Sequence, residues 1–297
     1  MRISFVIPAF NAATMLPDAI DSIFAGNFTH GDEVIIVDDA STDETGIVAE
    51  SLKKKYVPHV QVIHNQENKG CPASRNVGIT SAHNELICNL DADNILAPNS
   101  IHHLQAALEQ QNADMVAFGE YHFFSKDPAW ITHKWLCKPG VCTLADFFAG
   151  HINPGPGGNF LYTKASWSKI GQYWEYGKGL HEAWGFTLKQ LTAGSILYVV
   201  EGTHYYHRHG HASLFATESK KKEEAHELVQ KMIAPYQNLI TPTDWKYMQS
   251  NTNWYEQLDQ RPIQINDYAL GKNGIFKRTP YGIYVSIIRK LQQLFTT

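Results

Sequence analysis

The sequence predicts an α/β fold in which helices cover both faces of a mostly parallel sheet. Three observations predict it: four short apolar runs alternate with helical segments in the first 110 residues, each run is apolar almost throughout, and each ends in a polar loop. Near-continuous apolar strands are typical of parallel sheets whose two faces are buried, and strand–helix alternation favours parallel connections. The chain is therefore expected to be organised around one such sheet.

Each expected strand is followed by an expected helix. The strands are predicted over residues 3–7, 33–37, 60–63 and 85–90, where β-branched and other apolar residues cluster. Apolar residues at helical spacing follow the first three strands, beginning after Asn11, before Ile47 and near Pro72. Asn11 is expected to cap the first helix, since asparagine readily accepts a hydrogen bond from a helix N-terminus.

Polar residues follow every strand at its expected carboxyl end. The loops contain Asn11, then Asp38 and Asp39, then Asn68 and Lys69, then Asp91 and Asp93. Ligands of open parallel sheets bind beyond the carboxyl ends of the strands. These loops are therefore the expected position of a functional site.

Asp91 and Asp93 are the first candidates for a metal site. Side chains at positions i and i+2 of a strand share a face, so both carboxylates can point toward one ligand. Magnesium and manganese ions are commonly held by one or two carboxylates together with phosphate oxygens. On its own the triplet is weak evidence, because such triplets more often cap a helix or close a turn.

The composition describes a folded, soluble globule of 297 residues, with 43% hydrophobic and 18% charged residues. A formal net charge of −4 argues against nucleic acid as the main partner. The four cysteines show no C-x-x-C pair and no zinc-finger spacing, so free thiols in a reducing, cytoplasmic compartment are expected. The sequence shows no signal peptide and no run of about 18 apolar residues, so no membrane-spanning segment is expected.

Two common phosphate-binding motifs are missing, G-x-G-x-x-G after the first strand and G-x-x-x-x-G-K-[ST]. A bound nucleotide would then need a metal ion or basic side chains. The pair Asp91 and Asp93 is the candidate for the first, and Arg75 is the candidate for the second.

Four segments carry a resemblance to a known family. They are Val6-Ile7-Pro8-Ala9-Phe10-Asn11, Val37-Asp38-Asp39-Ala40-Ser41-Thr42-Asp43, residues 68–78 with Arg75-Asn76-Val77-Gly78, and Leu90-Asp91-Ala92-Asp93. In this order and spacing they resemble the successive motifs of the family 2 glycosyltransferases, closely over residues 1–110 and more loosely to about 215. The resemblance implies a GT-A domain with a Rossmann-like, mostly parallel sheet over residues 1–215. The change of composition and the helical spacing of apolar residues beyond it predict a helical C-terminal extension over 216–297.

The resemblance implies roles for the first two motifs. Pro8 and Phe10 fall in a segment that binds substrate, and Phe10 takes the position of an aromatic ring that stacks on the nucleobase. Asp39 matches the aspartate that accepts a hydrogen bond from the base, while Asp38 is expected to orient the loop. Two alternatives stay open: Phe10 closes the edge of the core, and the two aspartates cap a helix.

The other two motifs imply the phosphate end of the site. Arg75 lies where the family places an arginine near the nucleotide and the metal carboxylates, and a structural ion pair with Asp91 or Asp93 is an equal alternative. The family assigns Asp91 to the ribose and Asp93 to a divalent metal, Mn²⁺ or Mg²⁺. Such an ion neutralises charge on the leaving diphosphate.

The catalytic base departs from the family pattern. The family has a Glu-Asp pair at the start of a helix, and its aspartate usually acts as the base. This chain reads His181-Glu182-Ala183-Trp184, so Ala183 stands in the position of the aspartate. Glu182 is the expected base and His181 the second candidate. Helix capping by Glu182 without catalysis stays open.

Residues 205–213 resemble the aromatic and basic segment that closes the catalytic domain, where related enzymes often use a histidine as a further metal ligand. His207, His209 and His211 alternate, so one face of a strand could present all three. His209 is the expected ligand. A solvated loop, or phosphate contacts from this segment and Arg208, are the alternatives.

The composition changes from Glu218, and the last segment is an expected amphipathic helix with basic neighbours. Its apolar face holds Ile283, Ile287, Leu291 and Leu294. A basic amphipathic terminus can lie on an anionic membrane surface, so peripheral contact with the inner face of the plasma membrane is one expectation. Docking against the catalytic domain is the other.

The resemblance therefore implies an inverting, metal-dependent glycosyltransferase. The expected donor is a UDP-sugar, and the expected acceptor is a hydroxyl of a polysaccharide or a lipid-linked saccharide. Because of Ala183, a non-catalytic partner that binds nucleotide sugar within an assembly is the alternative. Nucleotidyl transfer to a sugar phosphate is a third hypothesis, against which the missing glycine-rich loop argues.

Overall fold

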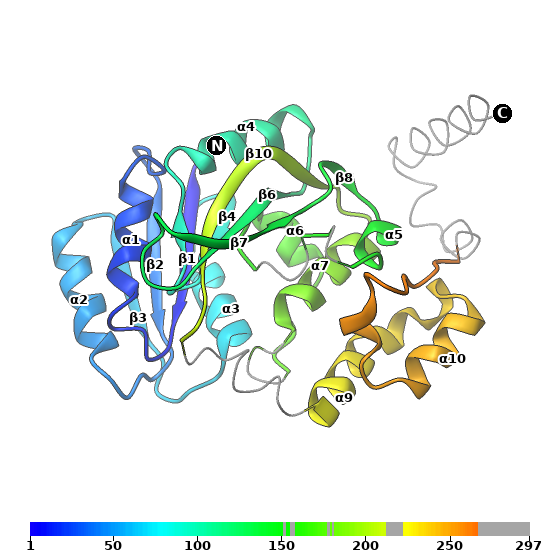
Figure 1. The fold of residues 1–297 in the computed structure, drawn as a ribbon. Helices are drawn as coiled ribbons and strands as arrows, with labels where there is room; N and C mark the ends of the chain where they lie inside the picture. Colours follow the sequence, from blue (N-terminus) through cyan, green and yellow to red (C-terminus); the bar gives the residue numbers. More distant parts are fainter. Residues whose placement is uncertain (151–152, 155–157, 177–178, 180, 212–221, 267–297) are drawn as a thin grey trace.

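The computed structural model describes residues 1–150, 153–154, 158–176, 179, 181–211 and 222–266. A ten-stranded sheet runs through the described part, with helices on both of its faces (Figure 1). Its strands are β1 (Ile3–Ala9), β2 (Glu33–Asp38), β3 (Val60–His64), β4 (Leu86–Asn89), β5 (Ile95–Leu96), β6 (Met115–Phe124), β7 (Ile131–Leu136), β8 (Gly140–Cys142), β9 (Phe160–Thr163) and β10 (Leu197–Arg208).

Helices alternate with the strands and then follow them. They are α1 (Leu16–Phe24), α2 (Thr45–Lys55), α3 (Cys71–Ser81), α4 (Ser100–Gln110), α5 (Leu144–Phe147), α6 (Lys164–Lys169), α7 (Glu182–Thr192), α9 (Lys222–Ile233) and α10 (Pro242–Ser250), with 3₁₀ helices η3 (Ala234–Leu239) and η4 (Trp254–Gln257).

The strand order is β3-β2-β1-β4-β9-β6-β10-β5, with β7 paired to β6 and β8 paired to β10. The first four strands in this order are parallel neighbours, and β6 and β10 are parallel to each other. β9 lies antiparallel between β4 and β6 and joins the two groups. The prediction of a mostly parallel α/β sheet is confirmed.

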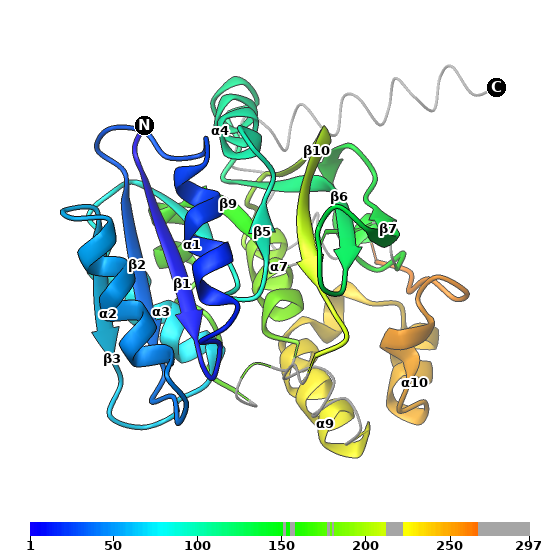
Figure 2. The ribbon, with the colours of Figure 1, turned by 60° about the vertical axis from the view of Figure 1, so that its left-hand side comes forward.

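The apolar strands are buried because helices cover both faces of the sheet. All 7 residues of β1 are buried. α1 and α2 lie on one face of β1, β2 and β3, and α3 lies on the other (Figure 2). A Cβ atom added to Gly78 of α3 would lie 2.5 Å from Cγ1 of Val6 in β1. The missing side chain therefore allows α3 to pack directly on the sheet.

Two local predictions are wrong. α1 begins at Leu16, after Met15, and not near Asn11. Asn11 has a left-handed backbone with φ 51°. Its side-chain oxygen accepts a hydrogen bond from the Thr42 N–H at 2.9 Å, so it joins two loops instead of capping a helix. Asp91 and Asp93 lie in a turn after the end of β4, so strand alternation does not set the direction of their side chains.

The helices after residue 221 pack against the sheet domain through aromatic side chains. Trp254 of η4 is 0% exposed. Its ring centroid lies 6.2 Å from that of Trp184 in α7 and 6.5 Å from that of Phe148. Gly185 of α7 faces Met232 of α9, whose Sδ would lie 3.0 Å from an added Cβ. The start of α7 is therefore held between the sheet domain and the C-terminal extension.

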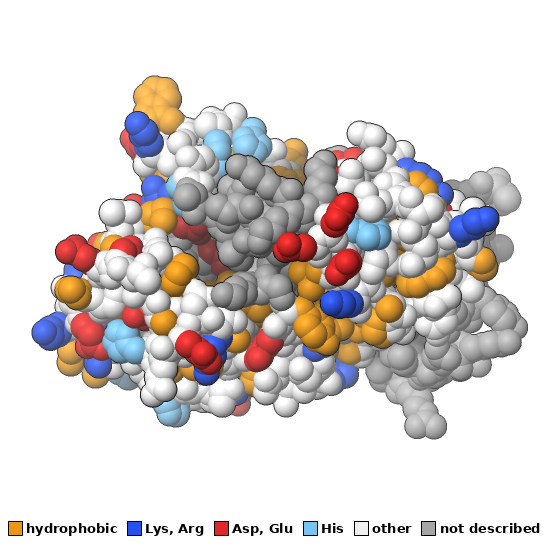
Figure 3. Space-filling view, turned by 90° about the horizontal axis from the view of Figure 1, so that it is seen from below, with side chains coloured by type: hydrophobic (Ala, Val, Ile, Leu, Met, Phe, Trp, Pro, Cys, Tyr) orange, Lys and Arg blue, Asp and Glu red, His pale blue; other side chains and the backbone are white. Residues whose placement is uncertain are grey.

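One face of the surface is seen from below in Figure 3. Acidic and basic side chains are interspersed on it, and hydrophobic side chains are more frequent on the side of α9 and α10 than on the side of α2. Among the described residues, no helix has the length and apolar character that crossing a bilayer requires. The predicted amphipathic segment around residues 283–294 lies outside the described residues.

Candidate functional site

The predicted site residues lie at the carboxyl ends of neighbouring strands. Phe10 follows β1, Asp39 follows β2, and Asp91 and Asp93 follow β4. Parallel strands bring these ends to one edge of the sheet, as the sequence predicts. Glu182 reaches the same edge from the first position of α7, because its carboxylate pairs with the Arg75 guanidinium that also binds Asp91.

Phe10 is an exposed aromatic residue at this edge. Its side chain is 48% exposed, in contrast to the buried residues of β1 that precede it. The alternative that Phe10 closes the core is therefore wrong. Pro8 is buried inside β1, where it pairs in register with Val37, so its ring faces the protein interior. An exposed ring beside a polar loop can stack on a flat base.

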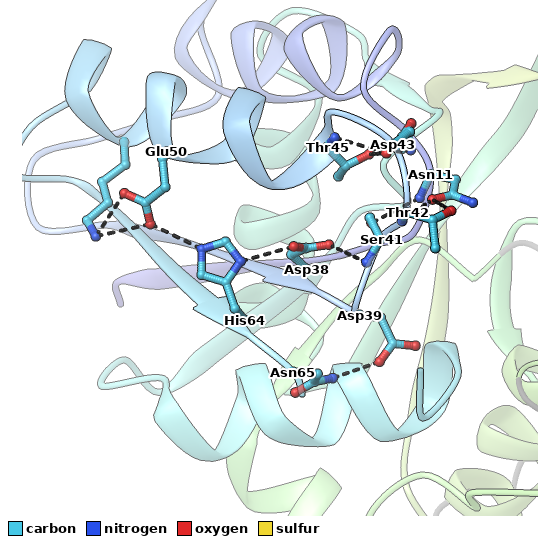
Figure 4. Close-up of polar contacts among 12 residues, drawn as sticks. Asn11, Asp38, Asp39, Ser41, Thr42, Asp43, Thr45, Glu50, His64 and Asn65 are labelled. Atoms are coloured by element: carbon cyan, nitrogen blue, oxygen red, sulfur yellow. Dashed lines mark hydrogen bonds and ion pairs between the residues drawn. The ribbon is translucent and has the colours of Figure 1, made fainter. Parts of the chain in front are cut away.

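The loop of residues 38–43 is held by a network of polar contacts, shown in Figure 4. Asp38 accepts a hydrogen bond from the Ser41 N–H at 3.1 Å, and its second oxygen lies 3.0 Å from Nδ1 of His64. The Ser41 hydroxyl oxygen accepts a hydrogen bond from the Asn11 N–H at 3.1 Å. Asp38 orients the loop through these contacts, and the loop in turn holds the residue that follows Phe10.

Asp39 binds the neighbouring loop. One carboxylate oxygen accepts hydrogen bonds from the Asn65 amide at 2.7 Å and the Lys69 N–H at 3.0 Å, and the other accepts one from the Gly70 N–H at 2.7 Å. The residue is 2% exposed. A carboxylate has about four acceptor positions, so one position stays open for a ligand. Asp39 therefore shapes the loop before α3 whether or not it contacts a base.

Arg75 is a buried cation that joins two carboxylates. Its side chain is 1% exposed, Nη2 lies 2.5 Å from Oδ1 of Asp91, and Nη1 pairs with Oε1 of Glu182. The structural ion pair that the sequence analysis left open is present, and its partner is Asp91. Burying one charge without a partner is strongly destabilising, so the three side chains form a unit.

Glu182 uses both of its carboxylate oxygens within the protein. Oε2 accepts a hydrogen bond from the backbone N–H of Ala183, and Oε1 pairs with Arg75. Burial raises the pKa of Glu182, and the nearby Arg75 opposes this rise. Burial likewise raises the pKa of Asp91, again opposed by Arg75. Raised carboxyl pKa values in one cluster are typical of sites that exchange protons or bind charged ligands.

Asp93 has a histidine beside it. Nε2 of His211 lies 3.0 Å from Oδ2 of Asp93, and Nδ1 of His211 is buried with no hydrogen-bond partner in the described part of the chain. Arg208 donates a hydrogen bond from Nε to the Asp93 carbonyl oxygen at 3.0 Å. The end of β10 therefore holds the turn that carries Asp93.

His209 does not lie beside the aspartates. Its Nε2 is 2.8 Å from the Thr132 hydroxyl in β7. The expectation that one strand face presents all three histidines is wrong, because β10 ends at Arg208 and the chain then turns. The structure thus brings His211 to Asp93 in place of His209.

Asp93 and His211 are the residues of this edge that could contribute ligands to a divalent cation. Within the described ranges, no group of three or more histidine, cysteine or acidic residues is arranged to hold a metal ion. Carboxylate oxygen and imidazole nitrogen are both accepted ligands of manganese, and magnesium and manganese take further ligands from phosphates. The single positive charge of Arg75 offsets only one of the two carboxylates that it binds, so the local charge also favours a cation.

The glycine-rich segment 153–161 resembles a family segment near the sugar and acceptor, but sequence reasoning did not predict that its Asn159 accepts a hydrogen bond from the Asp91 N–H at 2.9 Å. Sequence reasoning also missed His64. Polar residue type alone does not reveal either contact, because both join segments far apart in the sequence. His211 could be found as one of three alternating histidines, but that pattern does not tell which of them meets Asp93.

The sequence is similar to a known protein family and to individual glycosyltransferases. The model described as "Glycosyl transferase family 2" matches residues 4–215. Glycosyltransferase GlyG of Streptococcus pneumoniae is 30% identical over 125 residues, which are 42% of this chain and 41% of that protein. The uncharacterized glycosyltransferase EpsJ of Bacillus subtilis is 30% identical over 142 residues, 46% of this chain and 40% of that protein. The matched segment spans about two fifths of each relative.

Solved structures share the fold. TarS 1–349 of S. aureus in complex with UDP-GlcNAc has a TM-score of 0.61 at 14% identity, covering 88% of this chain and 91% of that one. The mannosyltransferase PcManGT of Pyrobaculum calidifontis, in complex with GDP-Man and Mn²⁺, has a TM-score of 0.62 at 13% identity, covering 99% and 81%. At these identities the similarity shows the GT-A fold alone.

Proposed function

The chain belongs to glycosyl transferase family 2, and from this premise we propose that it is an inverting, metal-dependent transferase using a nucleoside diphosphate sugar. The proposed donor is a UDP-sugar. The TarS complexes with UDP and UDP-GlcNAc support this choice, while the complex of the mannosyltransferase with GDP-Man makes GDP the nucleotide to compare. The proposed acceptor is a hydroxyl of a polysaccharide or of a lipid-linked saccharide at the cytoplasmic membrane face.

The observation that carries the proposal is the charge cluster at the sheet edge. Asp91 and Glu182 share the Arg75 guanidinium. Asp93, two residues after Asp91, contacts His211. A nucleotide lying across this edge would meet an exposed aromatic ring at β1 and acidic groups at β4. This order suits a base, a ribose and a diphosphate in sequence.

Each residue has a proposed task. Phe10 stacks on the base, Asp39 accepts its hydrogen bond through the remaining lone pair, and Asp91 contacts the ribose. Asp93 and His211 would hold Mn²⁺ or Mg²⁺. When bound there, such an ion neutralises the charge that develops on the leaving diphosphate.

Glu182 is the proposed general base. The acceptor hydroxyl oxygen bonds to the anomeric carbon, the bond from that carbon to the diphosphate oxygen breaks, and the hydroxyl proton passes to the Glu182 carboxylate. The attack comes from the face opposite the leaving group, so the single displacement inverts the configuration. The Arg75 contact of Glu182 must loosen for the carboxylate to accept this proton.

Calorimetric titration tests the donor site. UDP and GDP are added to the full chain, with Mn²⁺ and with chelator. We expect metal-dependent binding of UDP that Asp93→Ala abolishes, because the variant removes the carboxylate that would hold the metal.

Glu109→Gln is the matched control, since it removes a carboxylate at the end of α4, just before the start of β6 and thus at the opposite edge of the sheet. It should bind UDP as the unchanged chain does. Binding of neither nucleotide under any condition, or equal binding by the Asp93→Ala chain, contradicts the proposal.

A further inference from the structure

We infer that His64 is a positioning residue for the nucleotide site, and that its protonated ring holds the loop of residues 38–43 in the form that shapes this site. The inference rests on the proposed function, because that function puts the nucleobase beside this loop. The polar partners of the His64 ring are Asp38 and Glu50, so its effect on Phe10 and Asp39 would pass through other groups of the loop.

His64 lies between two carboxylates from different elements. It is the last residue of β3, and its register partner on β2 is Asp38. Nδ1 of His64 lies 3.0 Å from Oδ2 of Asp38, and Nε2 lies 3.3 Å from Oε1 of Glu50 in α2 (Figure 4). A neutral imidazole carries one N–H donor, whereas the imidazolium carries two. Two facing carboxylates therefore select the protonated ring.

The charged groups around the His64 ring also favour its protonated form. The hydrogen bond that His64 donates to Asp38 raises the pKa of His64, burial opposes this rise, and the hydrogen bond to Glu50 adds to it. Lys53 of α2 lies 3.3 Å from Oε2 of Glu50 and is the next charged group in this chain of contacts among the described residues. The side chain of Asp38 is 9% exposed, so its charge depends on protein partners more than on water.

Gly46 at the start of α2 makes room for the pair. A Cβ atom at this position would lie 3.0 Å from Oδ2 of Asp38 and 3.6 Å from Cε1 of His64. The absence of a side chain lets the helix approach while the carboxylate and the imidazole remain in contact. The pair is thus built into the packing of α2 on the sheet.

A continuous path of hydrogen bonds leads from His64 to the site. Oδ1 of Asp38, the oxygen that does not contact His64, accepts a hydrogen bond from the Ser41 N–H, and the Ser41 hydroxyl oxygen accepts one from the Asn11 N–H. Asn11 then accepts from the Thr42 N–H at 2.9 Å, which closes the path back onto the loop. Phe10 precedes Asn11, and Asp39 follows Asp38. The two residues proposed to read the base are therefore direct chain neighbours of this network.

The sign of the pH effect follows from the raised pKa. Below the pKa of an ordinary histidine, about 6.5, the ring bridges both carboxylates and its stabilising effect is complete. As the pH rises through the higher value in the folded protein, the proton leaves and one carboxylate faces a ring lone pair. The loop then loses an anchor, and nucleotide affinity should fall.

The experiment measures the Kd of UDP by calorimetry with Mg²⁺, from about pH 6.5, above the second pKa of a phosphate, to about pH 9. For the unchanged chain we expect about threefold to tenfold weaker binding at the upper end, a modest change because His64 is 44% exposed. His64→Gln should bind weakly at every pH. His64→Arg, which keeps a positive charge throughout, should bind tightly at every pH.

His83→Gln is the matched control. His83 lies 3.0 Å from Glu33, which begins β2 at the opposite edge of the sheet, and its side chain is 81% exposed. This variant should keep the pH profile of the unchanged chain. The inference is overturned if His64→Gln retains that profile, or if His64→Arg binds as weakly as His64→Gln.

NMR separates this inference from the donor proposal. The backbone amide signals of Ser41 and Asn11 should titrate with His64 in the free protein and stop doing so in His64→Gln. Amides that ignore His64 overturn the inference even where UDP binds. Titrating amides with no UDP binding at any pH overturn the donor proposal and, with it, the role of the loop in nucleotide binding.

Discussion

The family motif implies an aspartate at the position that Ala183 occupies in this chain. Glu182 is therefore the carboxylate that remains at the start of α7. Its position fits a base, because an acidic group at a helix N-terminus is stabilised there and faces the end of the sheet. Its contacts fit a structural role, because one carboxylate oxygen pairs with Arg75 and the other accepts a hydrogen bond from the Ala183 N–H. Only kinetics separates the two roles.

Replacing Glu182 by Gln tests the base. The amide keeps the size of the side chain but cannot take a proton, so sugar transfer should fall by about 10² to 10⁴ while UDP binding survives. In the unchanged chain, kcat/KM should fall as the pH drops through the pKa of Glu182. Burial raises that pKa, so this fall should begin at a higher pH than for an exposed carboxylate.

Glu109→Gln again serves as the control for the loss of a carboxylate. Transfer at full rate by Glu182→Gln would show that another group takes the proton. Absence of transfer by the unchanged chain, with UDP still bound, would favour the non-catalytic alternative that Ala183 suggests.

At this scale, motifs with fixed spacing single out Asp91, Asp93 and Arg75 in the sequence, and their roles in binding stay predictions. The structure adds the contacts of these residues, such as the ion pair between Arg75 and Asp91. The choice of His211 over His209 could not, because it depends on β10 ending at Arg208 and on the turn that follows. The anchoring of Asp38 by His64 depends on strand register, which the sequence alone did not reveal.

The packing of helix α3 on the sheet requires a close approach between the helix and β1. α3 carries Arg75 to the site, and Gly78 lets it lie on β1. We expect Gly78→Ala to destabilise the protein by about 1–3 kcal/mol, because the new methyl group would overlap Val6. Urea unfolding measures the free energy difference.

The double variant Val6→Ala with Gly78→Ala is the matched test. Removing the γ-methyl groups of Val6 makes room for the new methyl group, so the double variant should be more stable than the sum of the two single changes predicts. Additive effects would mean that contact with Val6 is not what limits the approach of α3.

The strands and helices of the first 110 residues could be predicted because their apolar patterns are strong. The antiparallel insertion of β9 between β4 and β6 could not be predicted from β9 itself, since Phe160–Thr163 is a short apolar run without directional information. Direction is set by which edge of the sheet is free, and this is a property of the assembled fold.

At the scale of the whole molecule, the packing of the C-terminal extension on α7 is the feature that the sequence motifs did not predict. The proposed boundary at residue 215 separates the family match from the rest, yet Trp254 packs on Trp184, two residues after Glu182. Motif reasoning cannot reveal such packing, because any apolar partner of the right size would serve. The extension is therefore expected to help position the start of α7.

Trp254→Ala should destabilise the folded chain by about 3–5 kcal/mol, since it leaves a large cavity beside Trp184 and Phe148. Chemical denaturation measures the loss, and kcat should fall because the start of α7 loses its support. Trp130→Ala is the control: Trp130 is 78% exposed, so its removal should change stability little. Equal stability of the two variants would mean that the packing of Trp254 does not stabilise the folded chain.

The strand order also bears on synthesis at the ribosome. The strands β3, β2, β1 and β4 all come from residues 3–89, so this half of the sheet can assemble while the remainder is still being made. The free edge of β4 is covered only when β9 arrives at Phe160, and at typical elongation rates this takes on the order of seconds. An uncovered edge is a template for pairing with another chain. Nascent chains of this protein are therefore most exposed to aggregation during that interval, before the second half of the sheet has formed.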